Sequence, residues 1–234
     1  MTNRALLFTT GSIFARAVRI VLDELCLKYE RIEEITTPSV EDRAKATPTL
    51  QVPTFWDGDV RLWESSLIIE YLLSQYDSRT SETPTLAREI ARQAAYWRDR
   101  LVLSTVQTLG TSIAIVSQMK SSGISLEDAG YVQRNAERLP HLFGWLETEL
   151  VSDAEGFLPG YLSVQDIFLT CHVDFIENRP IDLDARLNDA PKIQALIERV
   201  RSRESLRNNP IYWWEPGVIG YEDDGTPIYQ ERVS

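Results

Sequence analysis

The fold of this chain is decided by one stretch, QVPTFWDGDVRLWESSLIIEY, at residues 51–71. Two short apolar runs flank Asp57 and Gly58, and this pair supplies the positive φ that a tight turn between two strands needs. From Glu64 onward the apolar residues change from alternation to helical spacing. The stretch therefore predicts a β-hairpin that leads directly into a helix.

The segment before the hairpin alternates between strand and helix. An apolar run at 5–8 predicts a buried strand, and apolar residues at helical spacing from Phe14 predict the helix that follows. Alternating apolar and charged residues at 29–35 predict a second strand, and the polar segment 36–48 predicts a loop. Together with the hairpin and its helix, this order describes a small α/β domain that ends near residue 77.

The segment 77–84 is polar and has no periodicity. After it, every strong pattern in the sequence is helical. Three apolar stripes have helical spacing: Ile90, Ala94, Trp97 and Leu101; Leu139, Leu142, Phe143, Leu146 and Leu150; and Ile193, Leu196, Ile197 and Val200. Ser163 and Asp166 have the spacing of a capping box, which opens a further helix. These patterns predict an all-helical second domain.

The patterns divide the chain into an α/β domain at 1–78, a linker at 79–84, a helical domain at 85–209 and a tail at 210–234. The aromatic residues of the tail, which has no helical period, are Tyr212, Trp213, Trp214, Tyr221 and Tyr229. So many aromatic side chains need a surface to pack on. We therefore expect the tail to pack back on the body of the protein, over the helical domain or the cleft between the domains.

The composition is that of a soluble globular protein. The 24 basic and 35 acidic residues give a net charge of −11, which is poorly suited to holding a phosphate backbone, so we expect no nucleic-acid partner. With no signal peptide and no apolar run of about 20 residues, we expect a cytoplasmic protein that does not bind a membrane. Cys26 and Cys171 lie in apolar helical patterns, which predicts two buried thiols, and no set of Cys and His has metal-ligand spacing.

Val52 and Pro53 stand where the first strand of the hairpin begins. Proline cannot donate to a strand ladder, so a trans proline at the start of an edge strand is one interpretation. A cis bond is the other interpretation; it would turn the Val52 amide and carbonyl outward, where they can bind an extended peptide like an added strand. Position alone leaves both open.

Glu64 and Ser65 end the hairpin and open the next helix. A side chain at this place can simply cap the free amides of the helix. The same amides and the helix dipole also make an anion site, which suits a carboxylate, while Glu64 can accept from an ammonium group. An acid beside a hydroxyl therefore suits an amino-acid end that carries both charges.

These residues resemble a motif of the glutathione transferases. The matching residues are Gln51-Val52-Pro53-Thr54-Phe55, Asp57-Gly58, Leu62 and Glu64-Ser65-Ser66-Leu67-Ile68-Ile69-Glu70-Tyr71-Leu72, against the pattern K/Q-V-P-x-L…D-G…L-x-E-S-x-x-I-x-x-Y-L. The segment 161–167 is similar to the helix start L-S-x-A-D of the same family. The resemblance implies a thioredoxin-like α/β N-terminal domain followed by an all-α C-terminal helical domain, the glutathione-transferase fold, in a homodimer.

The resemblance also implies how glutathione is held. In the family the proline is cis, and the residue before it binds the cysteinyl backbone of glutathione, which assigns these roles to Pro53 and Val52. Glu64 and Ser65 would hold the γ-glutamyl end. Gln51 would reach the glycyl carboxylate.

The catalytic residue that the resemblance implies is Ser12. The segment 11–20 is similar to the first-helix start S-P-x-x-R-x-V-R-I of serine-type members, in which the hydroxyl hydrogen-bonds the glutathione sulfur. A hydroxyl donor and a helix N-terminus both favour a thiolate over a thiol. Ser12 can also be a plain N-cap, and Thr9 and Thr10 are alternatives. Ile13 replaces the proline of the pattern.

The sequence therefore predicts a glutathione transferase involved in detoxification, with glutathione as co-substrate and no metal. The glutathione thiol would attack a hydrophobic electrophile in a pocket of the helical domain. The alternative is a non-enzymatic member of the fold that binds a ligand or a protein. Leu50, Gln51 and Ile13 favour the alternative. Leu50 and Gln51 stand where the pattern N-P-x-G-K-V-P has glycine and lysine, and Ile13 stands where the serine-type pattern has proline.

Other candidate residues have simpler interpretations. We expect Arg16 and Arg19 on a solvated surface and Trp97 in the core. Neither His141 nor His172 has an acidic or cysteine partner at ligand spacing, so we expect neither to be catalytic. By family resemblance, Tyr96, Arg100 and Thr108 lie on the helix that lines the substrate pocket.

Overall fold

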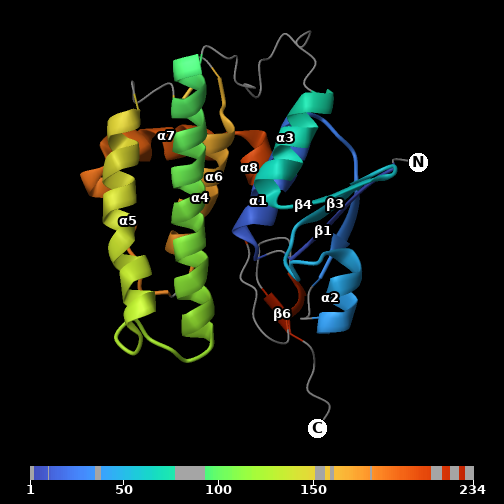
Figure 1. The fold of residues 1–234 in the computed structure, drawn as a ribbon, viewed down its shortest axis with the longest axis horizontal. Coiled ribbons are helices and arrows are strands. Elements are labelled where there is room, and N and C mark those ends of the chain that lie inside the picture. Colours follow the sequence, from blue (N-terminus) through green and yellow to red (C-terminus); the bar gives the residue numbers. More distant parts are fainter. Residues whose placement is uncertain are drawn as a thin grey trace. The chain divides into compact units, whose positions relative to one another are not determined.

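The structure, a computed structural model, describes residues 3–9, 11–34, 38–76, 93–150, 156–158, 161–179, 181–211, 218–221 and 227–229. The chain divides into two compact units, Met1–Tyr76 with Asn208–Ser234, and Asp77–Arg207. The first contains a four-stranded sheet and the second the long helices, which confirms the predicted fold class (Figure 1). The predicted linker at 79–84 lies outside the described residues, and the predicted domain boundaries stay predictions.

The first unit contains β1 (Arg4–Phe8), α1 (Ile13–Glu24), β2 (Glu30–Glu33), α2 (Val40–Ala46), β3 (Thr54–Asp57), β4 (Val60–Trp63), α3 (Ser65–Tyr76), β5 (Val218–Tyr221) and β6 (Pro227–Tyr229). The sheet has the order β2-β1-β3-β4, in which β1 runs parallel to β2 and antiparallel to β3. A parallel pair needs a crossover connection, and α1 provides it. β5 and β6 form a separate antiparallel pair.

The predicted hairpin is formed by β3 and β4. Asp57 pairs with Val60, so Gly58 and Asp59 make the two-residue turn. Gly58 has a φ of 59°, which is the positive φ that the sequence led us to expect.

The prediction of a loop at 36–48 is wrong, because this segment contains α2. Ser39 is the N-cap of α2, and its Oγ accepts from the N–H of Asp42 at 3.1 Å. No residue of α2 is buried, so the helix has no apolar stripe that the sequence could reveal. The signal that was available is the Ser-x-x-Asp spacing of its first turn.

Arg16 and Arg19 are buried, which corrects the prediction that they lie on a solvated surface. Arg19 is 1% exposed, and its guanidinium carbon lies 4.8 Å from the centre of the Phe8 ring. Burial lowers the pKa of Arg19 to about 10. Arg16 Nε donates to the backbone oxygen of Asn209 at 2.7 Å, and the Asn209 amide donates to Asp23 at 2.7 Å. Helix α1 thus holds the chain just before the predicted tail, whose side chains from residue 212 onward lie outside the described residues.

The two predicted buried thiols differ. Cys171 is buried in α6, as predicted. Cys26 is exposed, because α1 has already ended and the chain turns away there with a φ of 53°. In the sequence, the apolar residues keep helical spacing beyond Glu24, where α1 ends, and this spacing led to the wrong prediction for Cys26.

The second unit consists of α4 (Gln93–Ser121), α5 (Gly130–Glu149), α6 (Val164–Glu177), the 3₁₀ helix η1 (Leu187–Asp189), α7 (Pro191–Arg201) and α8 (Glu204–Arg207). Helix α4 packs against α5 and α6, and α6 is buried on every side except at its last residue. The predicted stripe of α7 is buried throughout, and that of α5 is buried except for the half-buried Leu142.

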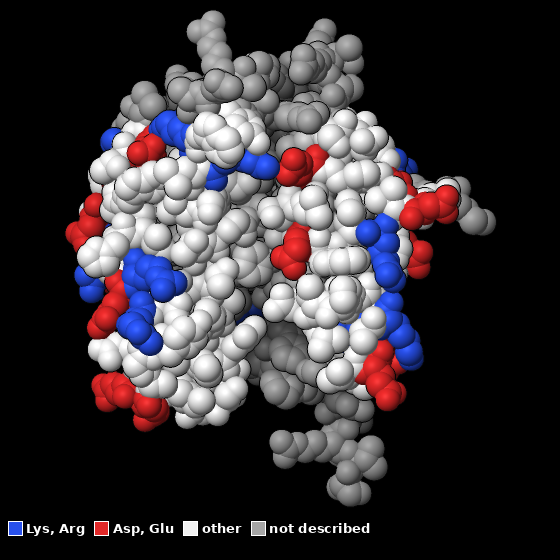
Figure 2. Space-filling model, viewed as in Figure 1, with Lys and Arg blue, Asp and Glu red and all other residues white. Residues whose placement is uncertain are grey.

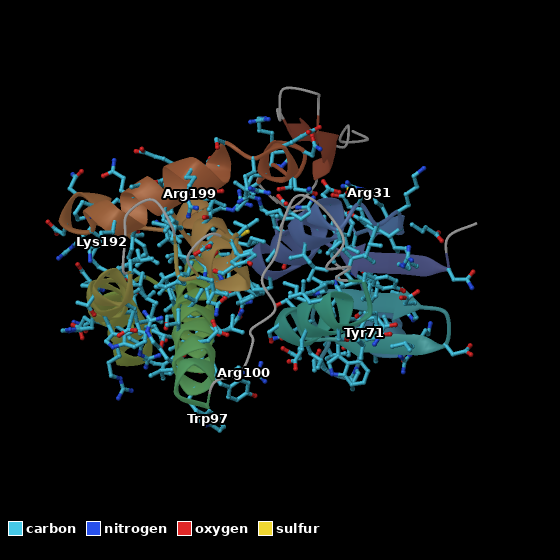
Figure 3. All side chains as sticks on the ribbon, turned by 90° about the horizontal axis from the view of Figure 1, so that it is seen from above. Arg31, Tyr71, Trp97, Arg100, Lys192 and Arg199 are labelled. Atoms are coloured by element: carbon cyan, nitrogen blue, oxygen red, sulfur yellow. The ribbon has the colours of Figure 1, made fainter. Side chains whose placement is uncertain are left out.

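The predicted stripe of α4 is wrong at Trp97 and Leu101, and its other members, Ile90 and the side chain of Ala94, lie outside the described residues. Trp97 is 68% exposed and Leu101 is 55% exposed, and Figure 3 shows Trp97 pointing away from the helices of its unit. The stripe that is buried lies further along, at Val102, Val106, Leu109, Ile113 and Val116.

Among the described residues, Tyr96–Ser121 is long and apolar enough to cross a membrane by length and composition. A stripe buried against two neighbouring helices is also the pattern of a core helix.

The C-terminal end of α5 and the N-terminal end of α7 stabilise each other. Glu147 of α5 accepts from the backbone N–H groups of Lys192 and Ile193, at 3.0 and 2.9 Å. Lys192 Nζ in turn donates to the backbone oxygen of Leu150 at 3.0 Å (Figure 3). A carboxylate therefore meets the positive end of one helix dipole, and an ammonium group meets the negative end of the other.

The predicted capping box at the start of α6 is confirmed. Ser163 Oγ accepts from the N–H of Asp166 at 3.0 Å, and the Asp166 carboxylate accepts from the N–H of Ser163 at 2.8 Å. The same carboxylate accepts from the N–H of Phe157 at 3.1 Å. Burial raises the pKa of Asp166 to about 6, although these hydrogen bonds act in the opposite direction.

Helices α4 and α6 approach each other closely at Gly110. A Cβ added at Gly110 would lie 2.3 Å from Nε2 of His172, which is completely buried. The His172 ring stacks on Phe168 at a centroid distance of 6.0 Å. Burial lowers the pKa of His172 to about 3, so this side chain is a neutral part of the core.

We predict that Gly110→Ala lowers the free energy of unfolding by about 2–3 kcal/mol, because the new methyl group must displace a packed imidazole. Gly144 on α5 has no atom within 4 Å of its Cβ position, so Gly144→Ala is the matched control. This control should raise the free energy of unfolding by about 0.5–1 kcal/mol, because alanine is the better helix former. Urea unfolding at pH 7 measures both, and similar effects of the two changes would contradict the close contact.

His172 should make the protein less stable in acid. Its pKa is about 3 in the folded protein and about 6.5 in an unfolded chain. Between these values unfolding takes up a proton, so the free energy of unfolding falls as the pH falls, by up to about 1.4 kcal/mol per pH unit. Asp166 opposes this trend, because its raised pKa makes unfolding release a proton between 3.8 and about 6.

A comparison of the parent with His172→Asn isolates the histidine, since Asp166 contributes to both proteins. The stability advantage of the parent should shrink as the pH is lowered from 6.5 to 4, when unfolding is followed by urea titration at each pH. An advantage that does not change with pH would contradict a neutral buried His172.

Candidate active site

The sheet register brings three predicted segments to one edge of the first unit. Thr54 of β3 pairs with Leu7 of β1 on one side and with Trp63 of β4 on the other. The loop before α1 therefore leaves the sheet at the same end at which the segment before β3 enters it and the chain after β4 turns into α3. Three separate parts of the sequence thus meet around the residues that precede Thr54.

The peptide bond between Val52 and Pro53 is cis, which decides between the two interpretations that the sequence left open. Pro53 is buried and Val52 is half-buried. The pairing of β3 begins at Thr54, so the backbone of Val52 lies outside the sheet ladder. Its amide and carbonyl are therefore available to an extended peptide that adds to this edge.

Glu64 has a φ of 71°, an unfavourable conformation for a side chain with a Cβ. Its backbone oxygen accepts from the N–H of Ile68 at 3.0 Å, so it stands directly before the first turn of α3. A non-glycine residue in this region costs about 1–2 kcal/mol and is commonly found where a ligand binds. The conformation leaves the Glu64 side chain exposed, while Ser65 beside it is 6% exposed at the start of the helix. The first amides of α3 have no acceptor within the helix and can bind an anion.

Ser12 is the N-cap of α1. Its Oγ accepts from the N–H of Ala15 at 3.2 Å, and its own N–H donates to the backbone oxygen of Thr9 at 3.1 Å. A serine hydroxyl has one proton and two lone pairs, so the cap occupies a lone pair and the proton can still be donated. The interpretation as a cap and the interpretation as a hydrogen-bond donor are therefore compatible. Thr10, one of the two alternatives, lies outside the described residues.

A polar cluster around Asp57 joins α3 to the sheet. Tyr71 Oη donates to the Asp57 carboxylate at 3.2 Å, and the hydroxyl of Tyr76 donates to the same oxygen. Arg4 of β1 lies 3.6 Å from the other oxygen and stacks over the Tyr76 ring. Burial, followed by the charge of Asp57, raises the pKa of Tyr71. The sequence analysis missed this cluster, because Asp57 was assigned only to the turn and no spacing rule links it to residues in α3.

The loop before the cis proline has an unusual residue at its centre. Leu50 has a φ of 58° and is 44% exposed, and its N–H donates to the backbone oxygen of Thr47 at 3.3 Å. Glycine adopts this conformation without a steric penalty, which explains why the family pattern has glycine there. Gln51 follows and is exposed.

Two family models match this chain. The model of the glutathione S-transferase N-terminal domain matches residues 6–80, and the model of the C-terminal domain matches residues 127–208. The chain belongs to the glutathione S-transferase family. Of the residues discussed above for the candidate site of this glutathione S-transferase, the N-terminal match includes all but Arg4.

Similar proteins agree with this family. A dichloromethane dehalogenase from Methylophilus leisingeri is 27% identical over 226 residues, which are 93% of this chain and 82% of the relative. A glutathione S-transferase from Methylobacterium radiotolerans, solved in complex with glutathione sulfonate, has a TM-score of 0.71 at 19% identity and covers 88% of this chain and 93% of its own. One from Methylobacillus flagellatus, solved with glutathione bound, has a TM-score of 0.70 at 19% identity, with coverages of 88% and 98%. At this identity the two structures show the shared fold.

The helical unit of this glutathione S-transferase contains the other candidates. Tyr96 and Trp97 meet edge to face at 5.0 Å, and Arg100 lies 5.6 Å from the centre of the Tyr96 ring. Thr108 Oγ1 donates to the backbone oxygen of Ser104 at 2.9 Å. Their contribution to a substrate pocket stays a prediction.

His141 lines a cavity of about 520 Å³ between α5 and the segment at 182–186. Aspartate side chains, Asp182 and Asp184, and the charged Glu137 and Arg186 also line it. Among the described residues, no group of three His, Cys, Asp or Glu side chains is placed to hold a metal ion.

We predict that Leu50→Gly raises the free energy of unfolding by about 0.5–1 kcal/mol, because glycine removes the steric cost of the positive φ and little buried area is lost. Leu50→Ala is the matched control, since it shortens the side chain but keeps the Cβ. Urea unfolding should show the gain for glycine alone. An equal gain for alanine would mean that the exposed side chain, and not the backbone, is unfavourable.

Proposed function

We propose that this protein is a glutathione transferase that uses Ser12 to stabilise the glutathione thiolate and attacks an electrophilic carbon. The observation that carries the proposal is the gathering of the cis Val52–Pro53 bond, the strained Glu64 and the N-terminus of α3 at one edge of the sheet. The resemblance to the family motif assigns the γ-glutamyl end to Glu64 and Ser65 and the cysteinyl backbone to Val52.

The sulfur of a peptide held in this way would lie toward the start of α1, where the loop from β1 ends. A free thiol has a pKa of about 8.5, so only a few per cent is ionised at neutral pH. Lowering that pKa by about 2 units requires about 2.7 kcal/mol of preferential stabilisation of the thiolate. A hydroxyl donor contributes about 1.5–3 kcal/mol to a charged acceptor, and the helix N-terminus adds a further part. Ser12 on α1 therefore offers enough stabilisation for the task.

The reaction is a displacement in which the chain's residues hold and ionise the thiol. The sulfur forms a bond to carbon while the bond between that carbon and its leaving group breaks, and the leaving group departs with the electron pair. The thiol proton is released to solvent when the thiolate forms. Because one relative is a dichloromethane dehalogenase, a dihalomethane with halide as leaving group is the first electrophile to assay. The homodimer, the cytoplasmic location and a role in detoxification stay predictions.

We predict that Ser12→Ala removes the ultraviolet thiolate band of bound glutathione at pH 7, while the dissociation constant of glutathione changes by less than about 3-fold, because only the sulfur contact is lost. Ser12→Thr is the matched control, since threonine keeps both the hydroxyl and the capping oxygen. It should retain the band. A thiolate band that survives in Ser12→Ala would transfer the role to Thr9, Thr10 or backbone amides.

Ser65→Ala should have the opposite effect. We predict that it weakens glutathione binding by about 10-fold or more, because a hydrogen bond to a carboxylate is lost, while the thiol pKa at saturation stays unchanged. Ser66→Ala, at the next position of α3, is the control and should bind normally. Glutathione that does not bind to the parent would overturn the enzyme proposal and leave the non-enzymatic alternative, which the departures at Leu50 and Gln51 favour.

A further inference from the structure

If a thiol peptide binds as proposed above, its third residue reaches the loop at 47–51. This inference rests on the proposed function. If the γ-glutamyl end is held at Ser65 and the middle residue pairs with Val52, an extended peptide continues away from Ser65, along the chain that precedes Val52. The residues it meets there are Gln51 and Leu50. They decide how the C-terminal end of the peptide is recognised.

The basic residues near this loop are already engaged with acidic ones. Between Ile35 and Val52 the sequence has two basic residues, Arg43 and Lys45. The Arg43 guanidinium pairs with the carboxylate of Glu34, and Lys45 Nζ donates to Asp42 at 2.7 Å. A carboxylate placed beside this loop would therefore compete with a carboxylate of the protein for either cation.

One further basic side chain reaches the same region. Arg61 of β4 donates to the backbone oxygen of Lys45 at 3.3 Å, so its guanidinium lies at the C-terminal end of α2. A cation at that place is held by the negative end of the helix. Basic and acidic side chains are both present on the face of this unit that Figure 2 shows.

The two loop residues that this binding mode brings to the third position, Gln51 and Leu50, are both neutral. The Gln51 side chain offers an N–H donor and a carbonyl acceptor, which fit a carboxamide as well as they fit a carboxylate. A neutral amide donates to a carboxylate without the opposite charge that an ammonium group would bring to the contact. The exposed Leu50 adds an apolar surface, which its φ of 58° fixes beside Gln51.

We propose that this protein does not recognise the charge at the C-terminal end of its thiol substrate. It binds γ-glutamylcysteinyl peptides whose C-terminus is neutral, such as the amide or the ethyl ester of glutathione, as tightly as it binds glutathione itself.

The test is titration calorimetry of the full chain with glutathione, its C-terminal amide and its C-terminal ethyl ester, at low ionic strength. For the parent, the three dissociation constants should agree within about 2-fold. Gln51→Lys should tighten glutathione binding by about 5-fold and leave the binding of the amide unchanged, because the new ammonium group pairs only with the carboxylate. Lys45→Gln and Arg61→Gln are controls, and neither should change the ratio between glutathione and its amide.

Three results would overturn the inference. The first is a parent that binds glutathione more than about 5-fold tighter than the amide, a ratio expected of an ion pair. The second is a loss of that preference in Lys45→Gln or Arg61→Gln, which would show that one of these side chains holds the carboxylate. The third is no binding of any of the three peptides, which overturns the proposed function as well. Discrimination between the peptides therefore rejects only the inference, whereas absence of all binding rejects both.

Discussion

The arrangement of this protein's candidate site depends on the pairing of Thr54 with Leu7 on one side and Trp63 on the other. This register decides which parts of the chain leave the sheet together. A shift of one residue would turn the side chains of β3 to the opposite face and would separate Val52 from the start of α3. The buried Phe55 resists such a shift, because it would have to leave the core.

Around that register the chain uses polar contacts to fix the helices. Asp57 joins β3 to α3 through the hydroxyls of Tyr71 and Tyr76, and Glu147 joins α5 to the N-terminus of α7. Each carboxylate accepts more than one donor, so it remains satisfied although it is partly removed from water. Rigid helix ends are what a peptide-binding site needs, because a ligand amide or carboxylate gains little from donors that move. The unfavourable conformations of Leu50 and Glu64 lie near the other end of β3, where Thr54 pairs with Trp63.

The candidate site could be proposed from sequence where chemistry and chain order coincide. Val52, Pro53, Glu64 and Ser65 stand within one short stretch, and their residue types suggest an extended peptide with a charged amino-acid end. Ser12 could be placed at a helix start because apolar spacing resumes directly after it. The predictions failed where burial contradicts residue type. Arg19 is charged yet is buried over the Phe8 ring, and Trp97 is apolar yet exposed.

The sequence by itself determined the hairpin, the helices with apolar stripes, the capping box at Ser163 and the family, because each rests on local spacing of residue types. Only the tertiary structure decided the cis state of Val52–Pro53, the positive φ of Leu50 and Glu64, and the contacts of Asp57 with α3. These features arise between residues that are distant in sequence, or from backbone torsions that several residue types can adopt. Local pattern does not encode them, and the packing of the whole first unit does.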